Sequence, residues 1–324
     1  MSMTIGNNDI YITSDNAGLC RISRFKGHSV EDIVLIRGTP CVAVRFSFDS
    51  LLVSAGETLY VISGNEARPV LKARSGNWFW HSVEGCGNFF VQEYGEPPTG
   101  IYVSEDLMHF RRVVTNNAID PLSKHFHYIT FDERRELLAT TLGDGNVVRV
   151  AVSDDCGSTW KPLYKGPWQF VPVLIDGNMW ILGFDSSIAR GGLAIYNTEV
   201  DKRSFVFLKA NGYRYAQFTS ITKFDNYYIG CLGYPTAIVA SKDMLHWYLL
   251  YLDETSTSYN HFVNASVWRD SVIATNGKEL LILDSRDVEE AFKKKPFLVP
   301  YKAWFDKIRG FVYILKRFPW MLRL

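Results

Sequence analysis

One stretch of eight residues constrains the fold more than any other part of the chain. Residues 153–160 read S-x-D-x-G-x-T-W. The carboxylate of Asp155 can accept hydrogen bonds from amides of its own turn, and Gly157 can adopt a positive φ without steric cost. The hydroxyl side chains on either side can cap strand ends, and the ring of Trp160 can pack between layers. The stretch therefore predicts a tight turn between two β-strands.

Weaker copies of this stretch recur along the chain. Residues 104–110 and 241–247 both read S-x-D-[LM]-x-H-aromatic, one residue shorter and without the glycine. Strand-like apolar runs that end in polar residues bring the total to seven candidate positions, at steps of 41 to 49 residues. Such a step matches a four-stranded propeller blade of roughly 40–50 residues.

The full stretch resembles the Asp-box of the sialidase and BNR-repeat proteins, a family of β-propellers. In that family the box is structural, so the resemblance implies a fold and not a reaction. We expect an all-β propeller of four-stranded blades. Seven blades are favoured; in the six-blade alternative, residues 9–37 complete the unit at 259–285. Residues 1–286 are assigned to the propeller and residues 287–324 to a C-terminal tail.

Charge and cysteine usage limit the setting in which the chain works. The net charge of +1 argues against nucleic acid as a partner. The five cysteines are an odd number, are widely spread and form no C-x-x-C, which predicts reduced thiols in the cytosol. The first residues lack the basic and apolar regions of a signal peptide, and no apolar run reaches about 18 residues. We therefore expect a cytoplasmic protein.

The tail differs in character from the rest of the chain. Residues 291–324 hold nine basic residues and one acidic residue, a net charge of +8. Its large apolar residues recur at helical spacing on one face: Trp304, Ile308, Phe311, Leu315 and Phe318. This pattern predicts a basic amphipathic helix in a membrane interface, on the inner face. The alternatives are a helix packed on the propeller and a calmodulin-type target helix.

Histidines gather where the innermost strands are expected to begin. His81, His125, His127 and His261 all occupy such positions, and His125 and His127 point to the same side of one strand. Two imidazoles with Glu93 or Asp144 would suit Zn²⁺ or Mn²⁺. The alternative is a pair of hydrogen-bonded histidines in the pore.

A second set of polar residues follows the expected second strands. Glu93, Asp144 and Asp185 each lie near a glycine in three consecutive blades. Two of them could act as a general acid and base, or all could cap loops. Over residues 90–190 the order of these motifs resembles a set of BNR-repeat propellers and, more loosely, propeller polysaccharide lyases such as those acting on ulvan. That likeness implies a histidine and a tyrosine as base and acid near a bound metal.

These patterns give a set of candidate residues. The candidate catalytic residues are His81, Glu93, His127 and Asp144. The candidate substrate-binding residues are Gln169, Asp185, Arg214, Tyr215 and His261. The candidate metal ligands are His125 and His127. Sialidase activity is not expected, because the nearest match to its F-R-I-P strand, residues 20–23, has neither the phenylalanine nor the proline.

Two functions remain open. The first is a carbohydrate-active propeller, lyase-like, hydrolase-like or in glycan assembly, at the cytoplasmic face of a membrane. The second is a non-catalytic propeller that binds a glycan or a protein and is peripherally attached to the membrane. Whether the histidines and carboxylates converge in one place separates the two.

Overall fold

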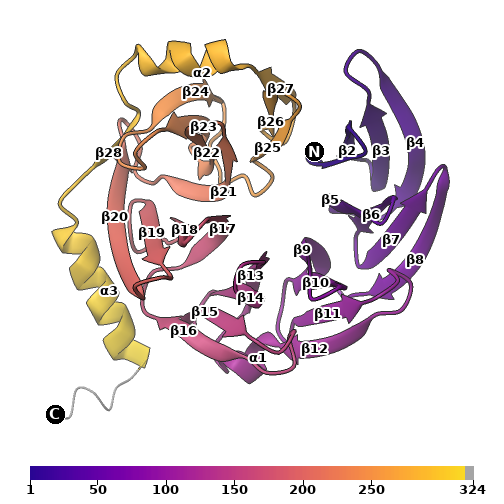
Figure 1. The fold of residues 1–324 in the computed structure, drawn as a ribbon, viewed down its shortest axis with the longest axis horizontal. Helices are drawn as coiled ribbons and strands as arrows, with labels where there is room; N and C mark the ends of the chain where they lie inside the picture. Colours follow the sequence, from indigo (N-terminus) through magenta and orange to yellow (C-terminus); the bar gives the residue numbers. More distant parts are fainter. Residues whose placement is uncertain (318–324) are drawn as a thin grey trace. The chain divides into compact units, whose positions relative to one another are not determined.

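The computed structural model describes residues 1–317 and divides the chain into two compact units, Met1–Tyr164 and Lys165–Leu324 (Figure 1). Within the described residues the strands form seven antiparallel sheets. The fold is an all-β, seven-bladed propeller of four-stranded blades, as the spacing of the turns predicts.

Unit 1 contains four sheets, each built from strands in sequence order. The first consists of β1 (Ser2–Gly6), β2 (Asp9–Asn16), β3 (Leu19–Phe25) and β4 (Val30–Arg37). The second consists of β5 (Cys41–Ser47), β6 (Ser50–Ala55), β7 (Thr58–Ser63) and β8 (Glu66–Lys72). The third consists of β9 (Trp78–Gly85), β10 (Asn88–Tyr94), β11 (Gly100–Ser104) and β12 (Arg111–Thr115), followed by the short helix α1 (Asn116–Ile119). The fourth consists of β13 (His125–Asp132), β14 (Leu137–Gly143), β15 (Val148–Ser153) and β16 (Lys161–Lys165).

Unit 2 contains three sheets and two helices. The first sheet consists of β17 (Phe170–Asp176), β18 (Met179–Phe184), β19 (Gly192–Asn197), β20 (Lys202–Ala210) and β28 (Leu298–Pro300). The second consists of β21 (Gln217–Phe224), β22 (Tyr227–Tyr234), β23 (Thr236–Ser241) and β24 (Tyr248–Leu252). The third consists of β25 (Asn264–Trp268), β26 (Ser271–Thr275) and β27 (Leu280–Leu283). The helices are α2 (Ser285–Phe292) and α3 (Trp304–Arg317).

The first and last sheets decide between seven blades and six. Residues 2–6 pair with β2, from Ser2 opposite Thr13 to Gly6 opposite Asp9, so the first sheet has its own fourth strand. The six-blade alternative is therefore wrong. The sequence did not indicate β1 because the strand has five residues and only two large apolar side chains. The last sheet has three strands, and α2 packs its buried Val288 next to them.

Three turns share the geometry predicted from the eight-residue stretch. In the turn from β15 to β16, Asp155 accepts hydrogen bonds from the amide and hydroxyl of Thr159, at 2.8 and 2.6 Å. Gly157 has φ 87°. In the turn from β11 to β12, Asp106 accepts hydrogen bonds from the backbone amides of Met108 and His109. In the turn from β23 to β24, Asp243 accepts them from the amides of Leu245 and His246. All three turns join the third strand of a sheet to the fourth, which explains their period.

The cysteines correct one prediction. Cys20 and Cys41 form a disulfide, as do Cys86 and Cys156, and Cys231 is a buried free thiol. The expectation of reduced thiols is therefore wrong. The paired residues are 21 and 70 positions apart, and only the folded sheets bring their Cα atoms to 5.1 and 6.0 Å.

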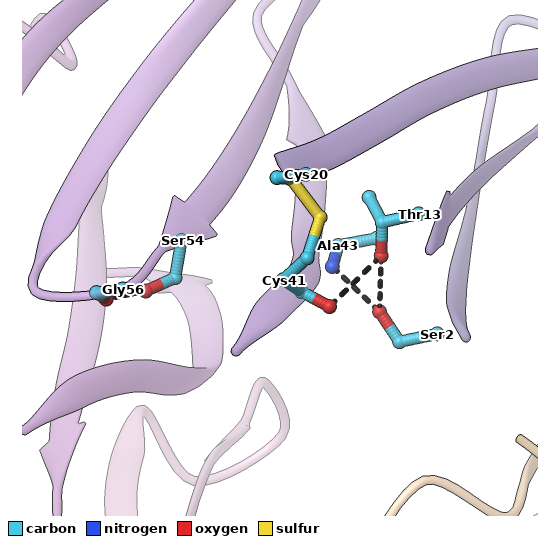
Figure 2. The surroundings of a disulfide bond; sticks show 7 residues. All are labelled: Ser2, Thr13, Cys20, Cys41, Ala43, Ser54 and Gly56. Atoms are coloured by element: carbon cyan, nitrogen blue, oxygen red, sulfur yellow. Dashed lines mark hydrogen bonds between the residues drawn. A yellow bond between two sulfur atoms is a disulfide. The ribbon is translucent and has the colours of Figure 1, made fainter. Parts of the chain in front are cut away.

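Figure 2 shows the first disulfide beside a hydrogen-bond network that joins the first two sheets. The Ser2 hydroxyl lies 2.7 Å from that of Thr13 and accepts a hydrogen bond from the amide of Ala43. The Thr13 hydroxyl donates to the carbonyl of Cys41. These bonds satisfy polar groups that the two sheets would otherwise bury without partners.

The tail forms the predicted helix in part. α3 is present, and Phe318 lies outside the described residues. Residues Leu298–Pro300 pair with residues 208–210 of β20, so part of residues 287–324 adds a strand to a propeller sheet. A search of residues 1–317 finds no helix with the length and apolar character needed to cross a bilayer.

Candidate functional site

A β-bulge in unit 1 brings two imidazole rings together, with their centres 5.0 Å apart and their planes tilted by 32°. On β13, His125 pairs with Gly143 and Phe126 with Leu142, but the next pair is Tyr128 with Thr141. His127 is therefore the extra residue of the bulge, a device that re-aims a side chain. The Nε2 atoms of His125 and His127 lie 3.1 Å apart. Both side chains are buried, each with 3% exposure.

A glycine makes room for this arrangement. Gly143 is the last residue of β14, and a Cβ atom there would lie 1.8 Å from Nε2 of His127. Any side chain at this position would displace the ring. The glycine is thus required by the close approach of the imidazole to the neighbouring strand.

Asp144 completes a cluster of three groups. It follows Gly143 with φ 55°, a left-handed conformation that aspartate tolerates better than most residues. Its Oδ2 lies 3.6 Å from Nε2 of His125. One ligand atom from each of the two histidines and from Asp144 lies within 4.8 Å of the others. The Asp144 side chain is 52% exposed, so the cluster is open to solvent on the aspartate side.

The backbone fixes the tautomer of His125. Its Nδ1 lies 2.8 Å from the carbonyl oxygen of Gly95, which can only accept a hydrogen bond. Nδ1 therefore carries the proton, and the lone pair of Nε2 faces His127 and Asp144. Burial lowers the pKa of His125, so the neutral ring prevails near neutral pH. A histidine held in this way is the usual form of a metal ligand.

The cluster fits a divalent metal ion. A tetrahedral Zn²⁺ with bonds of about 2.0–2.1 Å separates its ligand atoms by roughly 3.3 Å. The distances of 3.1 and 3.6 Å lie on either side of that value. Two imidazole nitrogens and one carboxylate also suit Mn²⁺. Such a set would leave at least one coordination position for water or substrate.

Glu93, the other carboxylate considered for this cluster, is engaged elsewhere. It is 2% exposed and accepts hydrogen bonds from the amides of Arg74 and Gly100, the side chain of Asn77 and the hydroxyl of Tyr102. Burial and the neighbouring Glu93 raise the pKa of Tyr102 to about 12. With four donors around it, Glu93 holds the residues near β10 and β11 in place.

Aromatic rings line one side of the cluster. The Tyr94 ring centre lies 4.1 Å from that of His125, and the rings of Trp78 and Trp80 lie 5.0 and 4.7 Å from Tyr94. Trp78 and Tyr94 are only partly buried. The stretch Q-E-Y-G that ends β10 thus supplies both this ring and the carbonyl bound by His125. The sequence draws attention to the stretch through its glutamate, whereas the tyrosine and glycine make the contacts.

His81 contacts two aromatic rings, Trp80 and Tyr128. Its ring stacks on Trp80 at 4.8 Å and lies 4.4 Å from Tyr128. Burial lowers the pKa of His81 to about 3, and its Nε2 has no hydrogen-bond partner among the described residues. His81 is therefore a neutral ring in an aromatic environment, adjacent to the cluster rather than part of it.

The five predicted substrate-binding residues all belong to unit 2. The amide of Asp185 donates to the carbonyl of Gln169 across the start of the β17–β18 pair. The Arg214 guanidinium lies 5.1 Å from the ring centre of Tyr215, just before β21. His261 lies 4.5 Å from the ring of Tyr259, just before β25. Four of the five precede the first strand of their sheet, and Asp185 directly follows the second strand, β18.

Comparisons with known proteins show the fold. No family model matches the chain, and neither does any curated protein. A streptogramin B lyase structure is similar with a TM-score of 0.62 and 13% identity, over 86% of this chain and 91% of that one. BamB from Moraxella catarrhalis is similar with a TM-score of 0.55 and 10% identity, over 87% and 81%.

A third similar structure is the extracellular domain of the hybrid two-component system BT4673 from B. thetaiotaomicron. Its TM-score is 0.60 at 8% identity, and this chain matches over 87% of its length but spans 39% of that protein chain. Sequence identities this low carry no family assignment and no residue roles. What the three likenesses establish is a β-propeller.

Proposed function

We propose that unit 1 binds a divalent transition metal through His125, His127 and Asp144, and that the protein uses this site to act on a carbohydrate. The observation that carries the proposal is the pair of Nε2 atoms 3.1 Å apart beside the Asp144 carboxylate. The Gly95 carbonyl directs one lone pair into the cluster. We favour lyase-like or hydrolase-like chemistry over simple binding.

The residues around the cluster support an open, reactive site. A metal held there would polarise a substrate oxygen or lower the pKa of a bound water. His125 and His127 are buried, and burial lowers the pKa of His125, whereas Asp144 reaches solvent and can exchange partners. The partly exposed rings of Trp78 and Tyr94 offer flat apolar surfaces of the kind on which sugar rings pack.

The similar structures add limited support. One of them is a lyase by name, and lyase-like chemistry is one of the two reactions proposed here. Because one propeller fold hosts unrelated activities, the cluster and not the fold carries the argument.

The alternative is a non-catalytic propeller that binds a glycan or a protein. One observation favours it: 3.1 Å is also a hydrogen-bond distance, so His127 could donate to His125 in a structural pair. A metal assay separates the two readings.

We further propose that the protein works in an oxidising compartment. The cytoplasmic placement expected from the sequence rested on reduced thiols and on the lack of a signal-peptide pattern in the first residues. Two disulfides in unit 1 favour the opposite environment, since such bonds persist mainly outside the reducing cytosol.

The test measures metal content and then turnover. The purified full chain is loaded with Zn²⁺ or Mn²⁺, dialysed and analysed by mass spectrometry, beside the variant His125→Ala/His127→Ala. His28→Ala, an exposed histidine of unit 1, is the control. We expect one metal per chain in the wild type and the control and none in the double variant. Metal-free wild type would overturn the proposal.

Turnover is then followed on a panel of polysaccharides. New unsaturated ends would indicate a lyase, and new reducing ends alone a hydrolase. Metal-dependent activity that the double variant lacks supports the enzyme. Stoichiometric metal without turnover, together with retained glycan binding, would favour the non-catalytic alternative.

A further inference from the structure

Helix α3 contacts the rest of unit 2 through its polar and small residues. Asp306 is 5% exposed and accepts hydrogen bonds from the amide of Arg190, at 3.3 Å, and from the hydroxyl of Tyr301. Gly310 is also buried, and a Cβ there would lie 2.8 Å from the Trp168 ring. The helix thus rests on the first sheet of unit 2 by its least apolar side, alongside β20 (Figure 1).

The opposite side of α3 is apolar and exposed. Trp304, Phe305, Ile308, Phe311 and Val312 are exposed by 71, 82, 56, 64 and 42%. Their spacing of i, i+1, i+4, i+7 and i+8 places them on one face. A soluble monomer rarely leaves so many large apolar side chains together in water, and such patches mark contact surfaces.

This face agrees only partly with the one predicted from the sequence. Trp304, Ile308 and Phe311 lie on it, and Leu315 is half-buried. Phe305 and Val312 also belong to it, although the predicted face did not include them. The difference arises because the inward side is fixed by Asp306 and Gly310, whose contacts the sequence does not show.

The apolar surface continues from α3 onto β20. A groove of about 590 Å³ lies between β20 and the residues that lead into α3. Its lining includes Phe205, Phe207, Leu245, Pro300 and Trp304, together with the side chains of Lys302 and Lys307. The groove is therefore an apolar hollow with cations at its rim.

Basic residues flank the apolar face. Lys302, Lys307 and Lys316 are exposed, and on a helical projection Lys307 and Lys316 lie on opposite edges of the face. The one acidic side chain of α3, Asp306, is buried on the inward side. An apolar face with cationic edges complements a bilayer that carries anionic headgroups.

We propose that α3 and the adjoining groove dock unit 2 on the surface of a bilayer that contains anionic phospholipids. The helix lies in the plane of the interface, with Phe305, Ile308 and Phe311 among the acyl chains. Lys302, Lys307 and Lys316 lie at headgroup level. The proposal rests on residues of unit 2 alone and is independent of the metal site.

The test is flotation of the full chain with vesicles of phosphatidylcholine alone or with about one third phosphatidylglycerol. We expect binding to the anionic vesicles. Phe305→Ser/Phe311→Ser should weaken it at least ten-fold, because it removes two of the three large exposed rings of α3. Lys302→Gln/Lys307→Gln/Lys316→Gln should weaken it roughly a hundred-fold on anionic vesicles, at a few-fold per charge.

The control is Leu35→Ser/Phe48→Ser, two side chains of unit 1 exposed by 56 and 60%. It should bind as the wild type does, and circular dichroism should show all variants folded. Absence of wild-type binding, or equal loss in the control, would overturn the proposal. Self-association that Phe305→Ser/Phe311→Ser abolishes, without any vesicle binding, would also overturn it and assign the face to a second copy of the chain.

Discussion

Removal of the disulfide between Cys86 and Cys156 should destabilise unit 1 more than removal of the other disulfide. Cys86 lies in the turn from β9 to β10, and Cys156 in the turn from β15 to β16, so the bond joins the sheet that carries the metal cluster to the sheet that precedes it. It closes a loop of 70 residues. The chain-entropy relation gives about 4 kcal/mol for a loop of that length at 25 °C.

The disulfide between Cys20 and Cys41 gives a smaller expected loss of stability for comparison. Cys20 and Cys41 are 21 residues apart, for which the same relation gives about 3 kcal/mol. Thermal and urea unfolding of Cys86→Ser/Cys156→Ser and of Cys20→Ser/Cys41→Ser, each in the full chain, would measure both losses. For a unit the size of unit 1, a loss of about 4 kcal/mol lowers Tm by roughly 10 °C.

Reductant and the fifth cysteine complete the experiment. A reducing agent should lower the Tm of the wild type to below that of either double variant. Cys231→Ala should respond to reductant as the wild type does, because Cys231 is buried and unpaired. Alkylation of five thiols in the unfolded, unreduced wild type would refute the pairing. A larger loss for the 21-residue loop than for the 70-residue loop would refute the entropic reasoning.

Three further outcomes follow from the site. Gly143→Ala should raise the metal Kd by about 10–100-fold in calorimetry, because a Cβ would displace the His127 ring; an unchanged Kd would contradict the assigned geometry. Glu93→Gln should lower the free energy of unfolding in urea by about 3 kcal/mol and leave the metal Kd unchanged, because a buried amide replaces a carboxylate that accepts four hydrogen bonds. Full stability with lost turnover would instead give Glu93 a catalytic role. Burial lowers the pKa of His81 to about 3, and the unfolded value lies near 6.5. The unfolded state therefore binds more protons, and below about pH 6.5 the free energy of unfolding should fall by about 1.4 kcal/mol for each pH unit. Urea unfolding at a series of pH values should show a smaller slope for His81→Phe than for the wild type.

The local turns were predictable from the sequence because their chemistry is contained in a few consecutive residues. Asp155 bonds to Thr159, four positions away, so one stretch specifies the whole turn. The repeat of that turn then sets the blade length and the fold class. Long-range pairings had no such signal: the two disulfides join residues 21 and 70 positions apart, and no spacing rule marks them.

The sequence did not show which side of α3 contacts the sheet, for a related reason. Helical periodicity shows which residues share a face, but not which face meets the sheet. Here the contact is made by Asp306 and Gly310, through Arg190 and Trp168 more than a hundred positions earlier. A polar docking side inverts the usual expectation that the apolar face of a surface helix is buried.

The same limit explains why the sequence could not choose between Glu93 and Asp144. Both carboxylates follow a second strand and lie near a glycine, so their local patterns are alike. Their surroundings differ: Glu93 is buried among four donors, whereas Asp144 is half exposed beside His125. Replacing hydrogen bonds to a buried carboxylate costs several kcal/mol in total, which ties Glu93 to its present partners. A half-exposed carboxylate gives up mostly water, so Asp144 is the one that can bind a metal at little cost.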